Sequence, residues 1–510
     1  MLFQAIAGTK SGHLPVATPR MKEQTDASSK PGAMNFNRIA LVVALLLGPT
    51  LAARADSSGS PSSQAREGWQ TFSPREEIRP AFTFDSHGGR SGKGAFVIQH
   101  DARDGLDGSW TKTFPVQGGH YYRFEVFRKT DRVSSPRRSA LVRLLWRNDK
   151  GGKVLRDEAP TAKGPRGIES SSATASARYE TNFLYGFTPT AEAEHPLDKT
   201  TDARGWTEVS DVYRAPTAAT QAAVELHLQW APSGKIEWSD VSLTEVPTPA
   251  PRKVRLAAVH FRPTAGKTPA EKCRAFAPFI EDAARQRADL VVLPETLTYF
   301  GTGLSFAECA EPIPGPSTDY FGGLARQHNL YIVAGLVERD RHLIHNVAVL
   351  LAPDGKVAGK YRKVCLPRDE VAAGIAPGNE YPVFDTRFGK LGMMVCYDGF
   401  FPEVARELSN RGAEVIAWPV WGCNPGLAEA RACENHVYLV SSTYEDPSHN
   451  WMLTAVWDQD GQTLSKADKW GTVIVTEVDL NQRLHWPSLG DFKAHLARHR
   501  PDPPQDRINQ

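Results

Sequence analysis

A cysteine at the end of an apolar stretch is the strongest chemical signal in the sequence. Residues 390–398 read KLGMMVCYD, and a helix-like segment opens at Pro402. The pattern predicts a buried strand that runs into Cys396 and then turns into a helix. A thiol at such a turn is exposed, and the amide N–H of Tyr397 is expected to point to where a developing oxyanion is stabilised. A core cysteine is the alternative, and it is the commoner fate of cysteines in strands.

Two charged residues stand at comparable places in other segments. Glu295 directly follows the apolar run DLVVLP, where a carboxylate costs free energy unless it is paired or reactive. Lys363 lies in the short basic and apolar segment KYRKVCLP. A salt-bridged glutamate and a surface lysine are the alternatives, and Lys360 and Arg362 are expected to be surface cations of that kind.

The second half of the chain contains the elements that must position these residues. Near-continuous apolar strands, which are typical of sheets buried on both faces, are predicted for residues 254–261, 289–295, 330–336, 390–398, 414–420 and 437–444. Helical segments separate several of them. The first helix has a clear start, with Thr268 as N-cap, Pro269 at the first helical position and Glu271 closing a capping box. Strands that alternate with helices predict an α/β domain covered by helices.

Residues 254–480 resemble the nitrilase, or carbon–nitrogen hydrolase, superfamily. The matching pieces stand in the family's order: LPET with Glu295, GKYRKVCLP with Lys363, MVCYDGFFPE with Cys396, and RACENHVYLVSS with Arg431, Glu434 and Asn435. The resemblance implies an α/β four-layer αββα sandwich that pairs into dimers or larger assemblies. Nitrilases proper usually carry Cys-Trp-Glu at the nucleophile. The sequence Cys-Tyr-Asp at 396–398 is similar to the amidase-like and carbamoyl-amide branches.

The resemblance also implies a mechanism without metal or cofactor. Cys396 is then the nucleophile, and Glu295 is the base that takes its proton. Lys363 holds the oxyanion together with the N–H of Tyr397, and its charge favours the thiolate. Family members usually have a second acid near the lysine. Glu370 stands at the matching distance, and Asp369 is its rival.

The reaction expected from this arrangement is cleavage of a small amide to an acid plus ammonia or an amine, through a cysteine thioester. Trp421 and Tyr299 are candidate substrate-binding residues, and core packing is an equal alternative for both. Two other functions stay open. One is a nitrilase or N-carbamoyl-amide hydrolase with the same triad. The other is a catalytically inactive secreted binding protein.

Residues 66–246 have a different pattern, in which apolar and polar residues alternate as in Val224 to Trp230. Strict alternation predicts strands with one buried face. We expect an all-β sandwich of jelly-roll type, loosely similar to galactose-binding-like domains, with a carbohydrate or cell-surface ligand. Trp110, Trp146 and Trp206 are candidates to stack on sugars, although core packing is commoner. Residues 161–203 are expected to form a long loop.

The flanking segments complete the predicted organisation. Residues 247–253 form a proline-rich linker, residues 254–485 the hydrolase domain, and residues 486–510 a C-terminal tail. Residues 34–55 combine a positive start, the short apolar run IALVVALLL and an Ala-x-Ala site. These features are typical of a secretory signal peptide. Residues 1–33 are expected to be a disordered, non-native leader before a true start at Met34, and the mature protein is expected to be exported to the periplasm or beyond.

Composition excludes several classes of protein. The 510 residues are 41% hydrophobic and 23% charged, which is typical of globular proteins and excludes a mostly disordered or collagen-like chain. The single apolar run is too short to span a bilayer, so a polytopic membrane protein is excluded. A net charge of +2 gives no electrostatic reason to expect nucleic acid as a partner. The expected partners are a small amide or nitrile substrate and further copies of the chain in a homo-oligomer.

Overall fold

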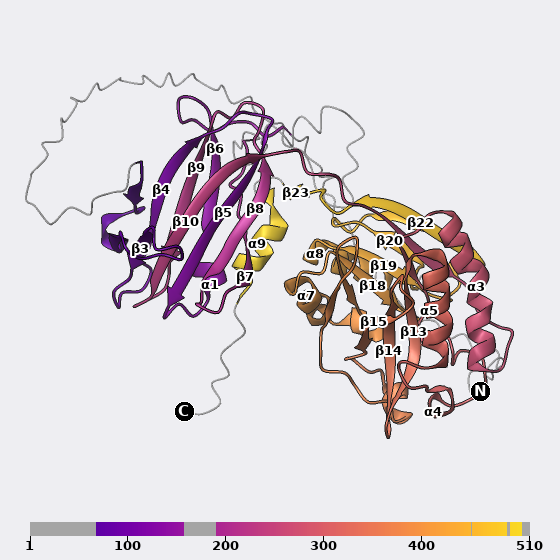
Figure 1. The fold of residues 1–510 in the computed structure, drawn as a ribbon. Coiled ribbons are helices and arrows are strands. Elements are labelled where there is room, and N and C mark those ends of the chain that lie inside the picture. Colours follow the sequence, from indigo (N-terminus) through magenta and orange to yellow (C-terminus); the bar gives the residue numbers. More distant parts are fainter. Residues whose placement is uncertain (1–67, 158–189, 450, 487–489, 502–510) are drawn as a thin grey trace, which may run out of the picture. The chain divides into compact units, whose positions relative to one another are not determined.

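The computed structural model describes residues 68–157, 190–449, 451–486 and 490–501 (Figure 1). The predicted leader and signal peptide lie outside these described residues. Within them, no helix has the length and apolar character needed to cross a membrane.

The first part of the chain forms two antiparallel sheets. One has the strand order β1-β4-β9-β6 and the other the order β2-β3-β10-β5-β8-β7. The strands are β1 (Gln70–Phe72), β2 (Ala81–Asp85), β3 (Ala95–Gln99), β4 (Asp107–Pro115), β5 (Tyr121–Asp131), β6 (Val142–Arg147), β7 (Leu197–Thr201), β8 (Thr207–Arg214), β9 (Gln221–Gln229) and β10 (Lys235–Val246). Two short helices, η1 (Glu76–Ile78) and α1 (Pro136–Ser139), interrupt them.

Aromatic side chains fill the core that these two sheets share. Trp110 and Trp146 belong to this core, with 0% and 2% of their surface exposed, and Trp206 is also buried. The sugar-stacking hypothesis for these three residues is therefore wrong, because a buried ring offers no face to a ligand. A galactose-binding-like identity and a carbohydrate ligand stay predictions.

Part of the expected loop at 161–203 is a strand. Residues 197–201 form β7, which pairs with β8 at the edge of the six-stranded sheet. Four of its five residues are exposed, so the strand lacks the alternation that reveals a half-buried strand in a sequence. Residues 158–189 of this stretch lie outside the described residues.

The second part of the chain contains two mixed six-stranded sheets. The first has the order β15-β14-β13-β12-β11-β22 and the second the order β16-β17-β18-β19-β20-β21. The strands of the first are β11 (Lys253–His260), β12 (Leu290–Val292), β13 (Tyr331–Asp340), β14 (Leu343–Leu351), β15 (Val357–Arg362) and β22 (Thr472–Asp479). Those of the second are β16 (Val383–Asp385), β17 (Lys390–Met393), β18 (Val415–Pro419), β19 (Tyr438–Ser442), β20 (Ala455–Trp457) and β21 (Thr463–Lys466).

Helices cover the outer faces of both sheets. Helices α3 (Pro269–Arg285) and α5 (Pro316–His328) contact the first sheet, and α7 (Pro402–Asn410) and α8 (Pro425–Asn435) contact the second (Figure 1). The shorter helices are α4 (Phe306–Cys309), α6 (Arg368–Ala372) and η2 (Cys396–Phe400). The layers therefore run helix, sheet, sheet, helix, which confirms the predicted αββα sandwich.

Local sequence rules explain this architecture well. Helix α3 begins at Pro269, and its N-cap is the predicted capping box, in which the Thr268 hydroxyl accepts from the Glu271 N–H at 3.3 Å. In β11, Leu256 and Ala258 lie in the core between the sheets, whereas the alternate residues Ala257 and Val259 lie beneath the helices. A strand buried on both faces reads as a continuous apolar run, as observed.

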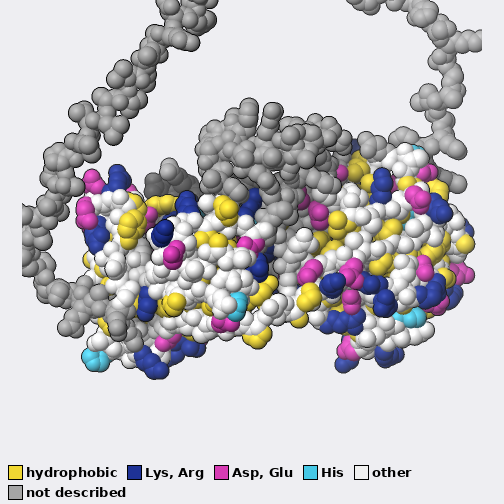
Figure 2. Space-filling model, turned by 90° about the horizontal axis from the view of Figure 1, so that it is seen from above, with side chains coloured by type: hydrophobic (Ala, Val, Ile, Leu, Met, Phe, Trp, Pro, Cys, Tyr) yellow, Lys and Arg dark blue, Asp and Glu magenta, His cyan; other side chains and the backbone are white. Residues whose placement is uncertain are grey.

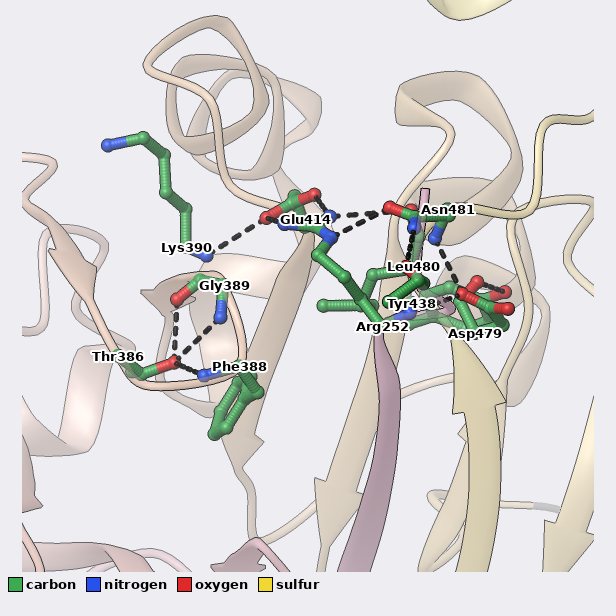
Figure 3. Close-up of polar contacts among 11 residues, drawn as sticks. Arg252, Thr386, Phe388, Gly389, Lys390, Glu414, Tyr438, Asp479, Leu480 and Asn481 are labelled. Atoms are coloured by element: carbon green, nitrogen blue, oxygen red, sulfur yellow. Dashed lines mark hydrogen bonds and ion pairs between the residues drawn. The ribbon is translucent and has the colours of Figure 1, made fainter. Parts of the chain in front are cut away.

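Arg252, near the end of the predicted linker, joins the two sheets at one edge of the sandwich (Figure 3). Its Nε donates to Asn481 Oδ1 at 2.8 Å, and its guanidinium pairs with Glu414. Glu414 directly precedes β18 and also accepts the Lys390 N–H at 3.1 Å, at the start of β17. The point where the chain enters the hydrolase part is therefore fixed to strands of both sheets.

The predicted C-terminal tail is not featureless. Strands β23 (His485–Trp486) and β24 (Gly490–Asp491) pair with each other, and helix α9 (Phe492–His499) follows. The cap of α9 is Asp491, whose side chain accepts from the Lys493 N–H.

Charged side chains of both signs are mixed on the face seen in Figure 2. Lys and Arg side chains stand next to Asp and Glu side chains, so this face carries no extended patch of one sign. That mixing agrees with a net charge of only +2.

Candidate active site

The site lies where several strands end. Glu295 follows β12, Lys363 follows β15 and Cys396 follows β17, at the carboxyl ends of strands that the two sheets bring together. Ligand sites of α/β folds lie at such strand ends. Cys396 itself has φ +41°, a left-handed backbone conformation that few side chains adopt, at the start of η2. The predicted strand-to-helix turn is therefore a sharp one.

Glu295 is almost completely buried and fully hydrogen-bonded. Its Oε1 accepts from Lys363 Nζ at 2.9 Å and from Asn346 Nδ2 at 2.8 Å. Its Oε2 accepts from the Trp421 N–H at 2.8 Å. Three nitrogen donors therefore hold this strand-end carboxylate, and the Cys396 thiol is a fourth group beside it. The arrangement holds a carboxyl group in a fixed orientation beside a sulfur atom.

The backbone around Glu295 is held closely by neighbouring residues. A Cβ atom on Gly335 of β13 would lie 2.5 Å from the Glu295 Cα, so only glycine permits this approach. On another side, the hydroxyl of buried Tyr444 donates to the Glu295 carbonyl at 3.2 Å. These contacts fix the position of the Glu295 backbone, and with it the point from which the carboxylate extends.

Lys363 is also buried, and it bridges two acids. Its Nζ donates to Glu370 Oε1 at 2.7 Å as well as to Glu295. Burial lowers the pKa of Lys363, but the charges of Glu295 and Glu370, together with that of Cys396 when the sulfur is ionised, outweigh burial and raise this pKa above its usual value. The lysine is therefore a permanent cation. Of the two candidate supporting acids, Glu370 is the one in contact, because Asp369 is exposed.

Burial and charge act on Glu370 in opposite directions. Burial raises the pKa of this carboxyl, the Lys363 charge lowers it and the Glu295 charge raises it again. The net effect is a raised pKa. One ammonium group thus has to balance two carboxylates in a dry environment.

The thiol of Cys396 is protonated at rest. Burial raises its pKa well above the usual value, and the Glu295 charge raises it further. The Lys363 charge lowers this pKa, as expected, but does not outweigh burial. The sulfur lies 3.6 Å from the Gly422 carbonyl. A base must therefore remove the proton as the sulfur attacks, and Glu295 is the carboxyl group beside the thiol that can do so.

Asp398 connects the cysteine turn to the lysine segment. Its carboxylate accepts from the Val395 N–H at 2.9 Å, the Cys365 N–H at 2.8 Å and the Tyr361 hydroxyl at 2.9 Å. Burial raises the pKa of Asp398 to about 6. This supporting role was not predicted, because the sequence shows Asp398 only as the last residue of the Cys-Tyr-Asp motif.

The Arg-Ala-x-Glu-Asn motif supports the same turn from α8. Arg431 Nε donates to the Gly399 carbonyl at 3.2 Å, and its Nη1 pairs with Glu434 at 2.9 Å. The motif therefore holds the backbone that follows Cys396.

The two candidate substrate-binding residues lie in different surroundings. The Trp421 ring is 44% exposed and meets Phe300 edge-on at 5.8 Å, directly beside the catalytic carboxylate that its N–H contacts. Tyr299 instead stacks on Phe306, with ring centroids 4.0 Å apart, beside a small apolar cluster. The surroundings of Tyr299 are those of packing.

Lys360 and Arg362 are not plain surface cations. Both pair with Glu338, which is 2% exposed, and the Arg362 Nε to Glu338 Oε2 distance is 2.7 Å. Side chains alternate along an extended segment, so Lys360 and Arg362 point to the side opposite to Lys363. Among the described residues, no group of three or more His, Cys, Asp or Glu side chains could hold a metal ion.

Comparisons with known proteins agree with this geometry. A model of the carbon–nitrogen hydrolase family matches residues 256–487. Omega-amidase NIT2 of Mus musculus is 31% identical over 242 residues, which are 42% of this chain and 87% of the mouse protein. The chain belongs to the carbon–nitrogen hydrolase family. It is therefore a hydrolase of carbon–nitrogen bonds other than peptide bonds.

Other members of the carbon–nitrogen hydrolase family are similar to this chain. A nitrilase of Pyrococcus abyssi is 42% identical over 174 residues, which are 32% of this chain and 64% of the relative. Among solved structures, Nit3 of Saccharomyces cerevisiae has a TM-score of 0.40 at 26% identity, covering 44% of this chain and 90% of Nit3. The amidase of Nesterenkonia sp. AN1 has a TM-score of 0.39 at 24% identity, covering 44% of this chain and 91% of the amidase.

Proposed function

We propose that this protein is an exported thiol amidase, which cleaves a small carboxamide to an acid plus ammonia or an amine. One observation carries the proposal. Glu295, Lys363 and Cys396 come from three separate segments and meet in one cluster, in which the sulfur lies beside a carboxylate that the ammonium group contacts at 2.9 Å.

The first half of the reaction follows from these contacts. Glu295 takes the proton of the thiol while Cys396 Sγ attacks the carbonyl carbon of the amide. The carbonyl oxygen becomes an oxyanion, which the Lys363 ammonium group and the N–H of Tyr397 stabilise. The C–N bond then breaks, Glu295 returns the proton to the leaving nitrogen, and the acyl group stays on sulfur as a thioester.

The second half consumes one water molecule. Glu295 takes a proton from water, and the hydroxide attacks the thioester carbon. The C–S bond breaks, the proton returns to the sulfur, and the acid leaves. Glu370 takes no part in these proton transfers. It orients Lys363 through the 2.7 Å contact to Nζ.

The acyl group of the substrate is proposed to be flat and apolar. Three exposed aromatic rings belong to segments that contact the site: Trp421, Trp451 and Phe401 are 44%, 39% and 37% exposed, and Phe401 meets the Tyr397 ring at 5.3 Å. Trp451 lies against Gly422, whose carbonyl contacts Cys396 Sγ, because a Cβ at that position would be 1.8 Å from Trp451 Nε1. Exposed aromatic groups beside a reactive centre favour apolar ligands.

Export is part of the proposal and rests on the predicted signal peptide at 34–55. Expression of the gene from Met34 in a bacterial host is expected to yield periplasmic protein whose N-terminal sequence begins near Asp56. Cytoplasmic protein with an intact N-terminus would contradict export while leaving the chemistry untouched.

Ammonia release from a substrate panel tests the chemistry. The panel contains phenylacetamide, the ω-amide of glutarate, phenylacetonitrile and an N-carbamoyl amine. We expect release from the amides, faster for phenylacetamide, and a shift of this preference in Trp421→Ala but not in Trp230→Ala, a 52% exposed tryptophan of the first part. Release only from the nitrile or the carbamoyl compound would favour those activities instead. No release from any compound by folded protein would favour a binding protein.

A further inference from the structure

Asn346 lies in the middle of the cluster, although nothing in its sequence context marks it. It belongs to β14, and its side chain is completely buried. Its Nδ2 donates to Glu295 Oε1 at 2.8 Å and to Glu370 Oε1 at 2.9 Å. A side-chain amide nitrogen has two protons, so both are used on the two carboxylates. The opposite amide orientation would place a carbonyl oxygen against two carboxylate oxygens, which fixes the assignment of nitrogen and oxygen.

Asn346 and Lys363 contact the same pair of oxygen atoms. Lys363 Nζ lies 2.9 Å from Glu295 Oε1 and 2.7 Å from Glu370 Oε1. Two nitrogen donors and two oxygen acceptors therefore alternate around a closed ring. The backbone holds the same pair together, because the Lys363 N–H donates to the Asn346 carbonyl at 2.9 Å. The ring contains one positive charge and two carboxylates, and the amide adds donors without adding charge.

We propose that Asn346 is a positioning residue of the amidase, which holds Glu295 and Glu370 on either side of the Lys363 ammonium group. This inference rests on the proposed function. Because Oε1 of Glu295 is held by the amide and the ammonium group, the carboxylate cannot rotate. Its other oxygen, Oε2, is held by the Trp421 N–H at 2.8 Å. The carboxylate plane is thereby fixed relative to the Cys396 sulfur.

The amide also affects the protonation of the cluster. The charged groups that act on Glu370 are Lys363 and Glu295, and Cys396 acts on Lys363. Burial and the Glu295 charge raise the pKa of Glu370, whereas the Lys363 charge and the hydrogen bonds from Lys363 and Asn346 lower it. Loss of the amide removes one of the influences that keep this carboxyl ionised. The Glu370 carboxyl then takes up a proton at higher pH.

Two variants of Asn346 test the proposal through kinetics. In Asn346→Ala we expect kcat on phenylacetamide to fall roughly 10- to 100-fold, the loss expected for a hydrogen bond to a charged group, while KM changes little. The acidic limb of the kcat/KM profile is expected to move to higher pH. Asn346→Asp places a third carboxyl in the ring and is expected to move this limb further than Asn346→Ala does.

The matched control is Gln229→Ala in the first part of the chain. Gln229 is also a buried amide, and its Nε2 donates to the Arg138 carbonyl at 3.2 Å. This variant is expected to lower the melting temperature without changing kcat or the pH profile. A lower melting temperature in Asn346→Ala with an unchanged kcat and acidic limb would overturn the positioning role.

A second readout separates this proposal from the proposed function. The rate of Cys396 alkylation by iodoacetamide, measured against pH by peptide mass spectrometry, needs no turnover. We expect the profile of Asn346→Ala to be displaced from that of the wild type, because the carboxylate beside the thiol is no longer fixed. Superimposable alkylation profiles would overturn the inference. Wild-type protein that is inactive on every amide would overturn the proposed function alone.

Discussion

Two clusters of opposite charges lie on or directly beside the first sheet of the hydrolase part and differ in what surrounds them. The site cluster consists of Glu295, Lys363 and Glu370. The edge cluster consists of Glu338, Asp340, Lys360 and Arg362, in which Arg362 Nη2 pairs with Asp340 at 2.8 Å. Strand β15 supplies the two cations of the edge cluster, and Lys363 is the next residue along the chain.

Charge balance and exposure separate the two clusters. In the edge cluster two cations face two acids, and the Lys360 and Arg362 side chains are 35% and 29% exposed. Burial raises the pKa of Glu338, but its hydrogen bonds and charges from Arg362 and Lys360 outweigh burial and lower it. In the site cluster one cation faces two acids, and the pKa of Glu370 is raised instead. Similar residue types therefore stabilise the fold in one place and remain available for chemistry in the other.

Removal of the sulfur is expected to have the largest effect. Only the site cluster contacts a nucleophile, so Cys396→Ala is expected to lower kcat by about 10⁴-fold or more while leaving stability unchanged. Ammonia release and thermal unfolding measure the two quantities. Cys309→Ala, a change at a buried cysteine outside the site, is the control and is expected to keep its activity. Equal loss in both variants would mean that the assays report folding.

Neutralisation of Glu338 is expected to cost stability and not activity. Breaking a buried, paired charge costs about 3 kcal/mol, so Glu338→Gln should unfold at lower urea concentration at pH 7. Because the pKa of Glu338 is lowered in the folded protein, its contribution is present above the unfolded pKa of about 4.3 and is lost as pH falls through the folded value. The difference in unfolding free energy between Glu338→Gln and wild type should therefore become smaller at acidic pH. A difference that grew in acid would contradict this sign, and exposed Glu77→Gln serves as the control.

Neutralisation of Glu370 is expected to lower activity and not stability. Its raised pKa means that the folded protein favours the protonated carboxyl, so the ionised form costs stability at neutral pH and this cost fades as pH falls. Glu370→Gln should therefore be as stable as wild type, or more stable, at pH 7. Its kcat should fall roughly 10- to 100-fold, because the ammonium group loses a charged partner. Urea unfolding and kcat, measured on one preparation of the variant, check the two expectations. Lower stability with full activity would contradict the comparison of the two clusters.

Removal of a partly exposed cation from the edge cluster is expected to have the smallest effect. Lys360→Met should lower the free energy of unfolding by at most about 1 kcal/mol, because a partly exposed ion pair contributes little and Arg362 still pairs with Glu338. Its kcat should equal that of wild type. A tenfold loss of kcat would show that the two clusters are coupled through β15.

Local sequence signals were enough to predict much of the structure. The capping box at Thr268 and Glu271 specifies its own helix start, and the apolar runs before Glu295 and Cys396 are buried strands because both of their faces are covered. These features depend on residues a few positions apart. The family motifs supplied the rest of the site: the contact between Glu295 and Lys363 joins residues 68 positions apart, which no local pattern reveals.

Other features could not be predicted, for physical reasons. Asn346 stands in an apolar strand and reads as an isolated core amide, since its acceptors are 51 and 24 residues away. Strand β7 is exposed at a sheet edge and therefore has no apolar alternation. Trp110 could be a core ring or a sugar platform on sequence alone, and only its burial decides between them.

The most direct test of the account is the partition of the acyl group between water and hydroxylamine. Phenylacetamide and N-methylphenylacetamide differ only in the leaving amine, so a shared thioester on Cys396 must give the same ratio of hydroxamate to acid from both. The account predicts equal ratios, together with an acyl adduct on the Cys396 peptide after acid quenching. Ratios that depend on the leaving amine, or an adduct on another residue, would contradict a thioester at Cys396.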